Sequence, residues 1–219
     1  MKAIKYDITR IKGGTDNCYL VSDGKKAILF DTSSAKSIDQ VIKVCSRYEM
    51  KALVLSHPHF DHAENAAAIS ERFNIPVAYH KADDEIFNSY NAQPLSSYGI
   101  VGFVVLKMSL KALRNTKVSR PENHFYIEEG DTFADYGFPD IRVVELPGHT
   151  KGSIGLLIQD HAVLVGDALD NWIRPGIGHL YYDRDILRKT SDRIRSFGPR
   201  QIFYGHGEPR GRGSWFILK

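Results

Sequence analysis

The chain has 219 residues, of which 42% are hydrophobic and 25% are charged, a composition typical of a globular protein. Its formal net charge of +3 is too small to indicate a dedicated nucleic-acid binder. Two cysteines, Cys18 and Cys45, exclude a disulfide framework and favour a reducing compartment. The sequence shows no apolar signal segment and no apolar run long enough to span a bilayer. We therefore expect a single cytoplasmic domain over residues 1–219.

The first part of the chain predicts a short β-meander followed by a helix. Three β-prone runs are separated by glycine-containing turns: Ala3–Ile11, Asn17–Val21 and Ala27–Phe30. After them, apolar residues from Ile38 to Cys45 recur on one face of a helix. Ser37 and Gln40 are spaced as a capping box at the start of this helix.

A strand–loop–helix unit comes next. Ala52–Leu55 is a short apolar run that predicts a buried strand, and Ser56–His62 is a polar loop. The alanine-rich stretch Ala63–Phe73 predicts a helix, and Pro76–Tyr79 predicts another short strand.

The second half of the chain returns to strands. Four runs carry the β pattern: Phe125–Ile127, Ile141–Glu145, Ile154–Ile158 and Ala162–Val165. A helix is expected over Arg184–Phe197 with Asp183 as its N-cap, and Gln201–Tyr204 is a final strand. Strands and helices thus alternate in two similar halves. This order predicts an α/β fold in which two sheets pack together with helices outside, a four-layer αββα sandwich.

The segment from Ser56 to His62 carries the strongest chemical signal in the sequence. It holds His57, His59, Asp61 and His62 between a buried strand and a helix. Residues two apart in an extended segment point the same way, so His57 and His59 can hold one cation together. Asp61 and His62 lie further along the loop and can serve a second cation. Asp61 could instead cap the following helix, which is the ordinary role of such a residue.

Three further candidates stand directly after predicted strands and beside glycine. They are His149, Asp167 and His206. A lone loop histidine is usually an ordinary polar residue, but the agreement of all seven positions with strand ends favours a metal site. Imidazole and carboxylate ligands suit Zn²⁺, and also manganese or iron. One carboxylate can bridge two cations that share a hydroxide.

These motifs resemble the metallo-β-lactamase superfamily. His57-Pro58-His59-Phe60-Asp61-His62 matches its HxHxDH signature, and Gly148-His149-Thr150, Gly166-Asp167 and Gly205-His206-Gly207 match its later motifs in order. The resemblance implies that His57, His59 and His149 hold a first metal ion. It implies that Asp61, His62 and His206 hold a second and that Asp167 bridges them, with Zn²⁺ as the favoured ion. Asp31 would lie behind the ligands and steady their loop.

The complete set of seven ligands resembles glyoxalase II, the acyl-homoserine lactonases and the RNase Z group. We therefore expect a hydrolase whose metal-bridging hydroxide cleaves a thioester, lactone or related ester, with Asp61 orienting the nucleophile or taking its proton. Two alternatives stay open. A persulfide dioxygenase-like oxidoreductase would use a single iron and leave His62 and His206 without a role. A phosphodiesterase acting on a nucleotide or nucleic acid is supported only by a basic segment.

That basic segment lies within residues 81–123, which we expect to form a mobile lid over the metal cleft. On a helix, Lys107, Lys111 and Arg114 would share one face and could bind an anionic or acyl small-molecule substrate. The apolar run from Ile100 to Leu106 also needs cover, from a substrate, a membrane surface or a second copy of the chain. The alternative is a solvated helix packed by its leucines. His179 and Tyr181, with Tyr182, are further candidates for lining the cleft.

Overall fold

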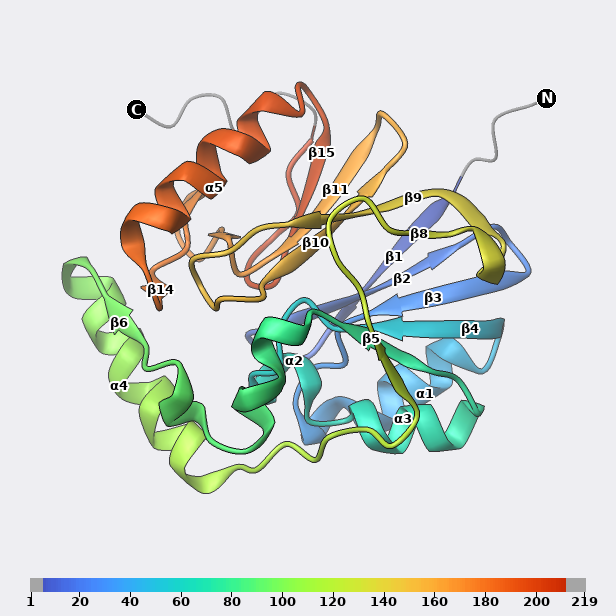
Figure 1. The fold of residues 1–219 in the computed structure, drawn as a ribbon, viewed down its shortest axis with the longest axis horizontal. Helices are drawn as coiled ribbons and strands as arrows, with labels where there is room; N and C mark the ends of the chain where they lie inside the picture. Colours follow the sequence, from blue (N-terminus) through green and yellow to red (C-terminus); the bar gives the residue numbers. More distant parts are fainter. Residues whose placement is uncertain (1–5, 212–219) are drawn as a thin grey trace.

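A computed structural model describes residues 6–211 of the chain and shows two β-sheets packed face to face (Figure 1). The first sheet has the order β1-β2-β3-β4-β5-β7. Its strands are β1 (Asp7–Lys12), β2 (Asn17–Ser22), β3 (Lys26–Phe30), β4 (Glu49–Val54), β5 (Val77–Tyr79) and β7 (His124–Tyr126). Strands β1 to β3 pair antiparallel, and β3 to β7 pair parallel.

The second sheet has the order β15-β11-β10-β9-β8. Its strands are β8 (Thr132–Phe133), β9 (Phe138–Glu145), β10 (Ile154–Ile158), β11 (Ala162–Gly166) and β15 (Gln201–Tyr204). Only β11 and β15 pair parallel. Two small ladders join β12 (Leu169–Asp170) to β13 (Gly176–Ile177) and β14 (Leu180–Tyr181) to β6 (Ser96–Ser97).

Three apolar cores separate four layers. The central core lies between the sheets and joins residues such as Phe30 of β3 and Leu156 of β10. A second core packs helices α1 (Ile38–Cys45) and α3 (Ala66–Phe73) on the first sheet. A third packs α5 (Arg184–Ser196) on the second sheet through Leu187 and Ile194. The predicted αββα sandwich is confirmed, because each sheet buries one face on the other and one under helices.

Most predicted elements are found, with differences at their ends. Strand β1 was expected from Ala3, and residues 3–5 lie outside the described part of the chain. Asp183 is the N-cap of α5, and its carboxylate accepts hydrogen bonds from the backbone N–H groups of Asp185 and Ile186. The capping box at Ser37 is wrong. Ser37 ends a 3₁₀ turn, η1 (Ala35–Ser37), and makes no side-chain cap hydrogen bond.

The helix predicted over Ala63–Phe73 is two helices, α2 (Phe60–Ala63) and α3. The break falls at Asn65, whose side-chain amide donates to the carbonyl groups of Thr32, Ser33 and Ser34. These bonds hold the break against the loop that follows β3. Asp61 and His62, predicted in the polar loop, thus lie in the short helix α2.

The expected lid segment is more regular than the sequence indicates. It contains the 3₁₀ turns η2 (Lys81–Phe87) and η3 (Tyr90–Ala92) and the long helix α4 (Gly99–Asn115). Figure 1 shows α4 beyond the sheets, on the side where α2 and α5 also lie. Within residues 6–211, no helix combines the length and hydropathy needed to cross a bilayer. A last 3₁₀ turn, η4 (Ala134–Tyr136), connects β8 to β9.

Candidate metal centre

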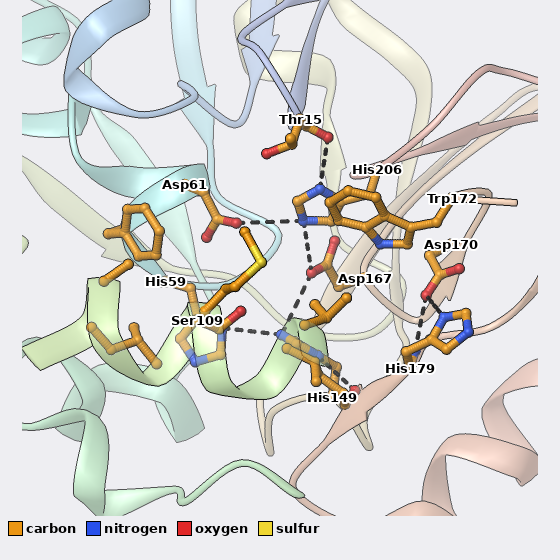
Figure 2. A pocket seen from close by; sticks show the side chains of 17 residues that line it. Thr15, His59, Asp61, Ser109, His149, Asp167, Asp170, Trp172, His179 and His206 are labelled. Carbon is orange, nitrogen blue, oxygen red and sulfur yellow. Dashed lines mark hydrogen bonds and ion pairs between the residues drawn. The ribbon is translucent and has the colours of Figure 1, made fainter. Parts of the chain in front are cut away.

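The structure brings all seven predicted ligands to one edge of the two sheets. They follow the C-terminal ends of four strands: His57, His59, Asp61 and His62 after β4, His149 after β9, Asp167 after β11 and His206 after β15. Several of them converge on one cavity in Figure 2. Strand ends of packed sheets meet at a common edge, which is where α/β folds place their sites.

The ligand atoms form three overlapping groups, and within each group they all lie within 4.8 Å of one another. One group is His57, His59 and His149, and another is Asp61, His62 and His206. The third joins Asp167 to His57 and His62. One oxygen of Asp167 lies 3.4 Å from Nε2 of His62, and the other lies 3.7 Å from Nε2 of His149. Asp167 is thus placed between the two outer groups, as a bridging ligand requires.

Hydrogen bonds on the second ring nitrogen fix the orientation of four histidines. Nδ1 of His62 lies 2.9 Å from Asp31, and Nδ1 of His57 lies 3.0 Å from the hydroxyl of Ser56. Nδ1 of His149 donates to the carbonyl of Leu180, and Nδ1 of His206 to that of Thr15. Each ring therefore presents Nε2 to the centre. His59 is the exception, because its Nδ1 lies 3.0 Å from Nε2 of His149.

The site fits divalent cations on its own geometry. The buried Nε2 atoms of His57 and His62 and Oδ1 of Asp167 make no hydrogen bond with any described residue. Buried polar atoms are rarely left without a partner, and these three face one another across the site. A cation between them would be a partner for all three, and nitrogen with carboxylate oxygen is a donor set that suits zinc.

The electrostatics of the centre agree with this fit. Burial, together with neighbouring histidines, lowers the pKa of His59 to about 3 and that of His57 well below its usual value, so both rings are neutral, as imidazole must be to bind a cation. Burial opposes ionisation of Asp61, but His62 and His206 outweigh it and hold its pKa at about 2. Burial likewise disfavours charged His62, but Asp167 and Asp31 outweigh it and raise its pKa. The negative charge of the carboxylates thus favours a positively charged group at the centre of the site.

Close backbone packing keeps the centre compact. A Cβ at Gly205 would lie 2.2 Å from Oδ1 of Asp167, so only glycine fits there. Gly148, with φ +126°, lets the backbone of Leu187 in α5 approach the loop of His149. Asp31 itself has φ +62°, a left-handed conformation that is uncommon for any residue but glycine. Such a conformation persists where the surroundings hold it, as the bonds to Ser56 and His62 do.

A cavity of about 240 Å³ opens onto the ligands. Trp172 stacks on His206 on one side of it, with ring centroids 4.8 Å apart and an interplanar angle of 16°. Helix α4 forms another wall through Val105, Met108, Ser109, Ala112 and Leu113. His179 also lines the cavity, and Asp170 accepts hydrogen bonds from its backbone N–H at 2.9 Å and from its Nδ1 at 2.6 Å.

The structure does not bring the predicted cations into this cavity. Lys107, Lys111 and Arg114 are exposed and are not among its lining residues. Lys107 lies over the ring of Phe103, and Arg114 lines a separate hollow beside η2 and η3. The cationic residues lie on the exposed side of the helix, and the α4 residues that line the cavity are Val105, Met108, Ser109, Ala112 and Leu113. The prediction that Lys107, Lys111 and Arg114 face the cleft is therefore wrong, because these side chains lie on the exposed side of α4.

The two tyrosines expected beside His179 also lie outside the cavity lining. Tyr181 donates its hydroxyl proton to the carbonyl of Ser97, which ties β14 to β6. Tyr182 lies under the ammonium group of Lys151. Both tyrosines therefore contact residues around the cleft and do not line it.

Several residues of the site had no role assigned from sequence. Ser56 precedes the histidine motif, and its position after a predicted strand could have marked it as a support for His57. Asp83 accepts hydrogen bonds from the hydroxyl of Thr150 at 2.6 Å and the N–H of Gly152 at 2.7 Å, which hold the loop of His149. Asp170 ends the two-residue strand β12 and Trp172 follows it, and neither residue stands in a motif that the sequence makes recognisable.

Comparisons with known proteins agree with this geometry. A family model described as the metallo-beta-lactamase superfamily matches residues 11–206. A Methanocaldococcus jannaschii protein named as a probable metallo-hydrolase is 26% identical over 205 residues, 90% of this chain and 89% of that one. The hydroxyacylglutathione hydrolase GloC of Haemophilus influenzae is 27% identical over 194 residues, 87% and 82% of the two chains. A solved structure in a di-iron-bound form aligns with a TM-score of 0.65 at 21% identity, covering 94% of each chain.

Proposed function

This chain belongs to the metallo-β-lactamase superfamily, and we propose that it is a hydrolase that holds two divalent cations and cleaves a thioester, lactone or related ester. The observation that carries the proposal is the place of Asp167, whose carboxylate faces His62 on one side and His149 on the other. A two-cation site needs such a shared ligand between two sets of terminal ligands.

His57, His59 and His149 would hold one cation, and Asp61, His62 and His206 the other, with Asp167 common to both. Zn²⁺ is the ion that this imidazole-rich set favours, and iron or manganese would also accept it. A pair of cations here would lower the pKa of a shared water molecule and so supply a nucleophile at neutral pH.

Asp61 is placed to steer that nucleophile. Its pKa of about 2 keeps it ionised, and Oδ2 lies 3.4 Å from Nε2 of His206. It also lines the cavity, so one carboxylate oxygen can orient the attacking water by accepting a hydrogen bond from it while the other faces the ligand set. Asp61 thus combines metal binding with orientation of the nucleophile.

His179 is the group placed to assist the leaving atom. His179 lines the cavity, Asp170 accepts a hydrogen bond from its Nδ1, and the ring of Tyr98 stacks on the imidazole with the ring centroids 5.5 Å apart. The hydrogen bond to Asp170 raises the pKa of His179, which favours the protonated form. As water oxygen bonds to the carbonyl carbon and the bond to sulfur or oxygen breaks, Nε2 gives its proton to the leaving atom. Solvent then returns a proton to the imidazole.

The two alternatives fit the described geometry less well. A single-iron oxygenase would leave His62 and His206 idle, yet both are held in place by hydrogen bonds to Asp31 and Thr15. A phosphodiesterase acting on nucleic acid would need lysine or arginine side chains to bind the anionic backbone of its substrate. No lysine or arginine is among the cavity-lining residues in the described part of the chain.

A substrate screen tests the proposal. The purified protein, loaded with zinc, iron or manganese in separate samples, is assayed against panels of acyl thioesters, lactones and phosphodiesters. We expect hydrolysis of at least one thioester or lactone, its loss on chelation and its return with added metal. Oxygen uptake with a persulfide, or cleavage of phosphodiesters alone, would overturn the proposal.

A further inference from the structure

The inner side of α4 is apolar and faces the ligands rather than a core. Val105, Met108 and Ala112 follow one another at helical spacing, and all three line the cavity beside His59 and Asp61. The other long helix, α5, turns its apolar side onto a sheet. The α4 residues of the cavity wall belong to none of the three buried apolar cores. Met108 is 68% exposed, and an occupant of the cavity would cover the inward surface of these residues.

The position of α4 is set at its first turn. Gly102 is buried, and a Cβ at this position would lie 3.3 Å from the carbonyl oxygen of His179 and from Cβ of Ser97. This close packing fixes the rotation of the helix about its axis. The same rotation leaves Ile100 86% exposed and Phe103 53% exposed on the outer side. The packing at Gly102 therefore determines which side of α4 faces the cavity.

The rest of the cavity continues this apolar surface. Phe60, Leu180 and Trp172 line it with the α4 residues, around the histidines and carboxylates. In the described part of the chain, the charged carboxylate residues that line it are Asp61, Asp167 and Asp170. An anionic group placed along α4 would meet no lysine or arginine, and burying it without a partner is costly.

We infer that the substrate carries an uncharged, apolar acyl group, which lies along the inner side of α4 while its carbonyl carbon faces the ligand set. This inference rests on the proposed hydrolase function and names its substrate class. Each methylene buried there adds about a fourfold gain in kcat/KM, because burial of one methylene contributes about 0.8 kcal/mol. The gain ends when the acyl chain fills the cavity.

A series of N-acetylcysteamine thioesters tests the inference, since the leaving group is the same small neutral thiol throughout. From acetyl to butyryl to hexanoyl, we expect kcat/KM to rise by about fourfold per methylene. The succinyl thioester, which has a carboxylate at the end of a four-carbon acyl group, should fall at least tenfold below butyryl. Equal rates across the series, or preference for succinyl, would overturn the inference.

A paired substitution on α4 makes the test specific to this wall. Ala112→Lys places an ammonium group inside and should reverse the order, favouring succinyl over butyryl by at least tenfold in kcat/KM. Lys111→Ala removes a cation from the adjacent, outward position and should leave the acyl preference unchanged. Metal content and circular dichroism of both variants report on folding. If Ala112→Lys folds and binds metal but keeps the butyryl preference, α4 does not contact the acyl group.

The outcomes separate the two proposals. Failure to hydrolyse any thioester, lactone or ester, with metal bound, contradicts the proposed function itself. Hydrolysis without dependence on acyl length or charge leaves that function standing and contradicts the apolar acyl site. Binding of hexanoic acid to the metal-loaded protein, measured by calorimetry against succinic acid, gives a second readout that needs no turnover.

Discussion

Nδ1 of His62 lies 2.9 Å from Oδ2 of Asp31, a fully buried carboxylate 31 positions earlier in the chain. The same carboxylate accepts hydrogen bonds from the backbone N–H and the hydroxyl of Ser56, and that hydroxyl in turn lies 3.0 Å from Nδ1 of His57. Asp31 therefore orients one histidine from each proposed cation site, His62 directly and His57 through Ser56.

Replacing Asp31 should weaken both cation sites together. In Asp31→Asn, the side chain keeps one acceptor oxygen, so it cannot accept from the backbone N–H of Ser56 at one position and from His62 at the other. Loss of a group that supports metal ligands costs about 10- to 100-fold in metal affinity. We expect that loss in a competitive chelator titration. Asp39→Asn, at an exposed position in the first turn of α1, is the control. Unchanged affinity in Asp31→Asn would show that Asp31 is not a support.

Asp167→Ala should cost more activity than metal. The variant keeps the three terminal ligands of each site but lacks the carboxylate between them. We expect kcat to fall by at least about 100-fold, which corresponds to roughly 2.7 kcal/mol, while most of the metal is retained. His57→Ala, which removes a terminal ligand, should lose metal and activity together. Turnover near the wild-type value in Asp167→Ala would rule out a bridging role.

Gly205→Ala tests how tightly the centre is packed. The added Cβ would lie 2.2 Å from Oδ1 of Asp167, so the carboxylate or the backbone after β15 must move. Overpacking of this kind costs about 1–3 kcal/mol. We expect a lower Tm in the metal-loaded protein and weaker metal binding. Gly211→Ala is the matched control, because a Cβ at Gly211 meets no atom of the described residues within 4 Å. Equal behaviour of the two variants would contradict the described packing.

The role of His179 predicts a particular pH dependence. Its hydrogen bond to Asp170 raises its pKa above the usual 6.5, with Tyr98 stacked on the ring and Arg184 beyond Tyr98. Below the raised pKa the imidazole is protonated and can donate, so kcat/KM for substrates with poor leaving groups is maintained. As the pH rises through that pKa, kcat/KM falls.

His179→Gln should lack this alkaline fall and lose at least about tenfold in rate with an alkyl ester. Proton donation matters less for a good leaving group, so a thiophenyl or nitrophenyl ester should lose little. A loss equal for all leaving groups would mean that His179 has only a structural role. The contribution of the Asp170–His179 pair to the free energy of unfolding also decreases as the pH rises. It is present below pH 6.5 and is lost as the pH rises through the raised pKa.

The seven candidate ligand positions, which the structure brings together, could be selected from the sequence because each is a local signal at a strand end. His57 and His59 share a side of an extended segment, and His206 stands between two glycines after a strand. The four layers could be predicted as well, since strands with buried patterns alternate with amphipathic helices. Parallel strands then bring distant loops to one edge of the sheet. This convergence can be predicted without knowing any individual contact.

The orientation of α4 could not be predicted in this way. Its sequence has both a cationic stripe and an apolar side, and either could face the site. The choice depends on the fit of Gly102 against His179 and Ser97, which lie in other segments. The helix break at Asn65 has the same origin, because its amide bonds to carbonyl groups of the loop after β3. Such tertiary contacts leave no periodic trace in the sequence.

The central claim is that two cations act together in hydrolysis, and the ratio of metal to activity tests it most directly. Metal-free protein is titrated with zinc, and bound metal per chain is measured by elemental analysis beside the rate of thioester or lactone hydrolysis. We predict that activity rises to a plateau at two ions per chain. Full activity with a single ion, or full activity after complete removal of metal, would contradict the account.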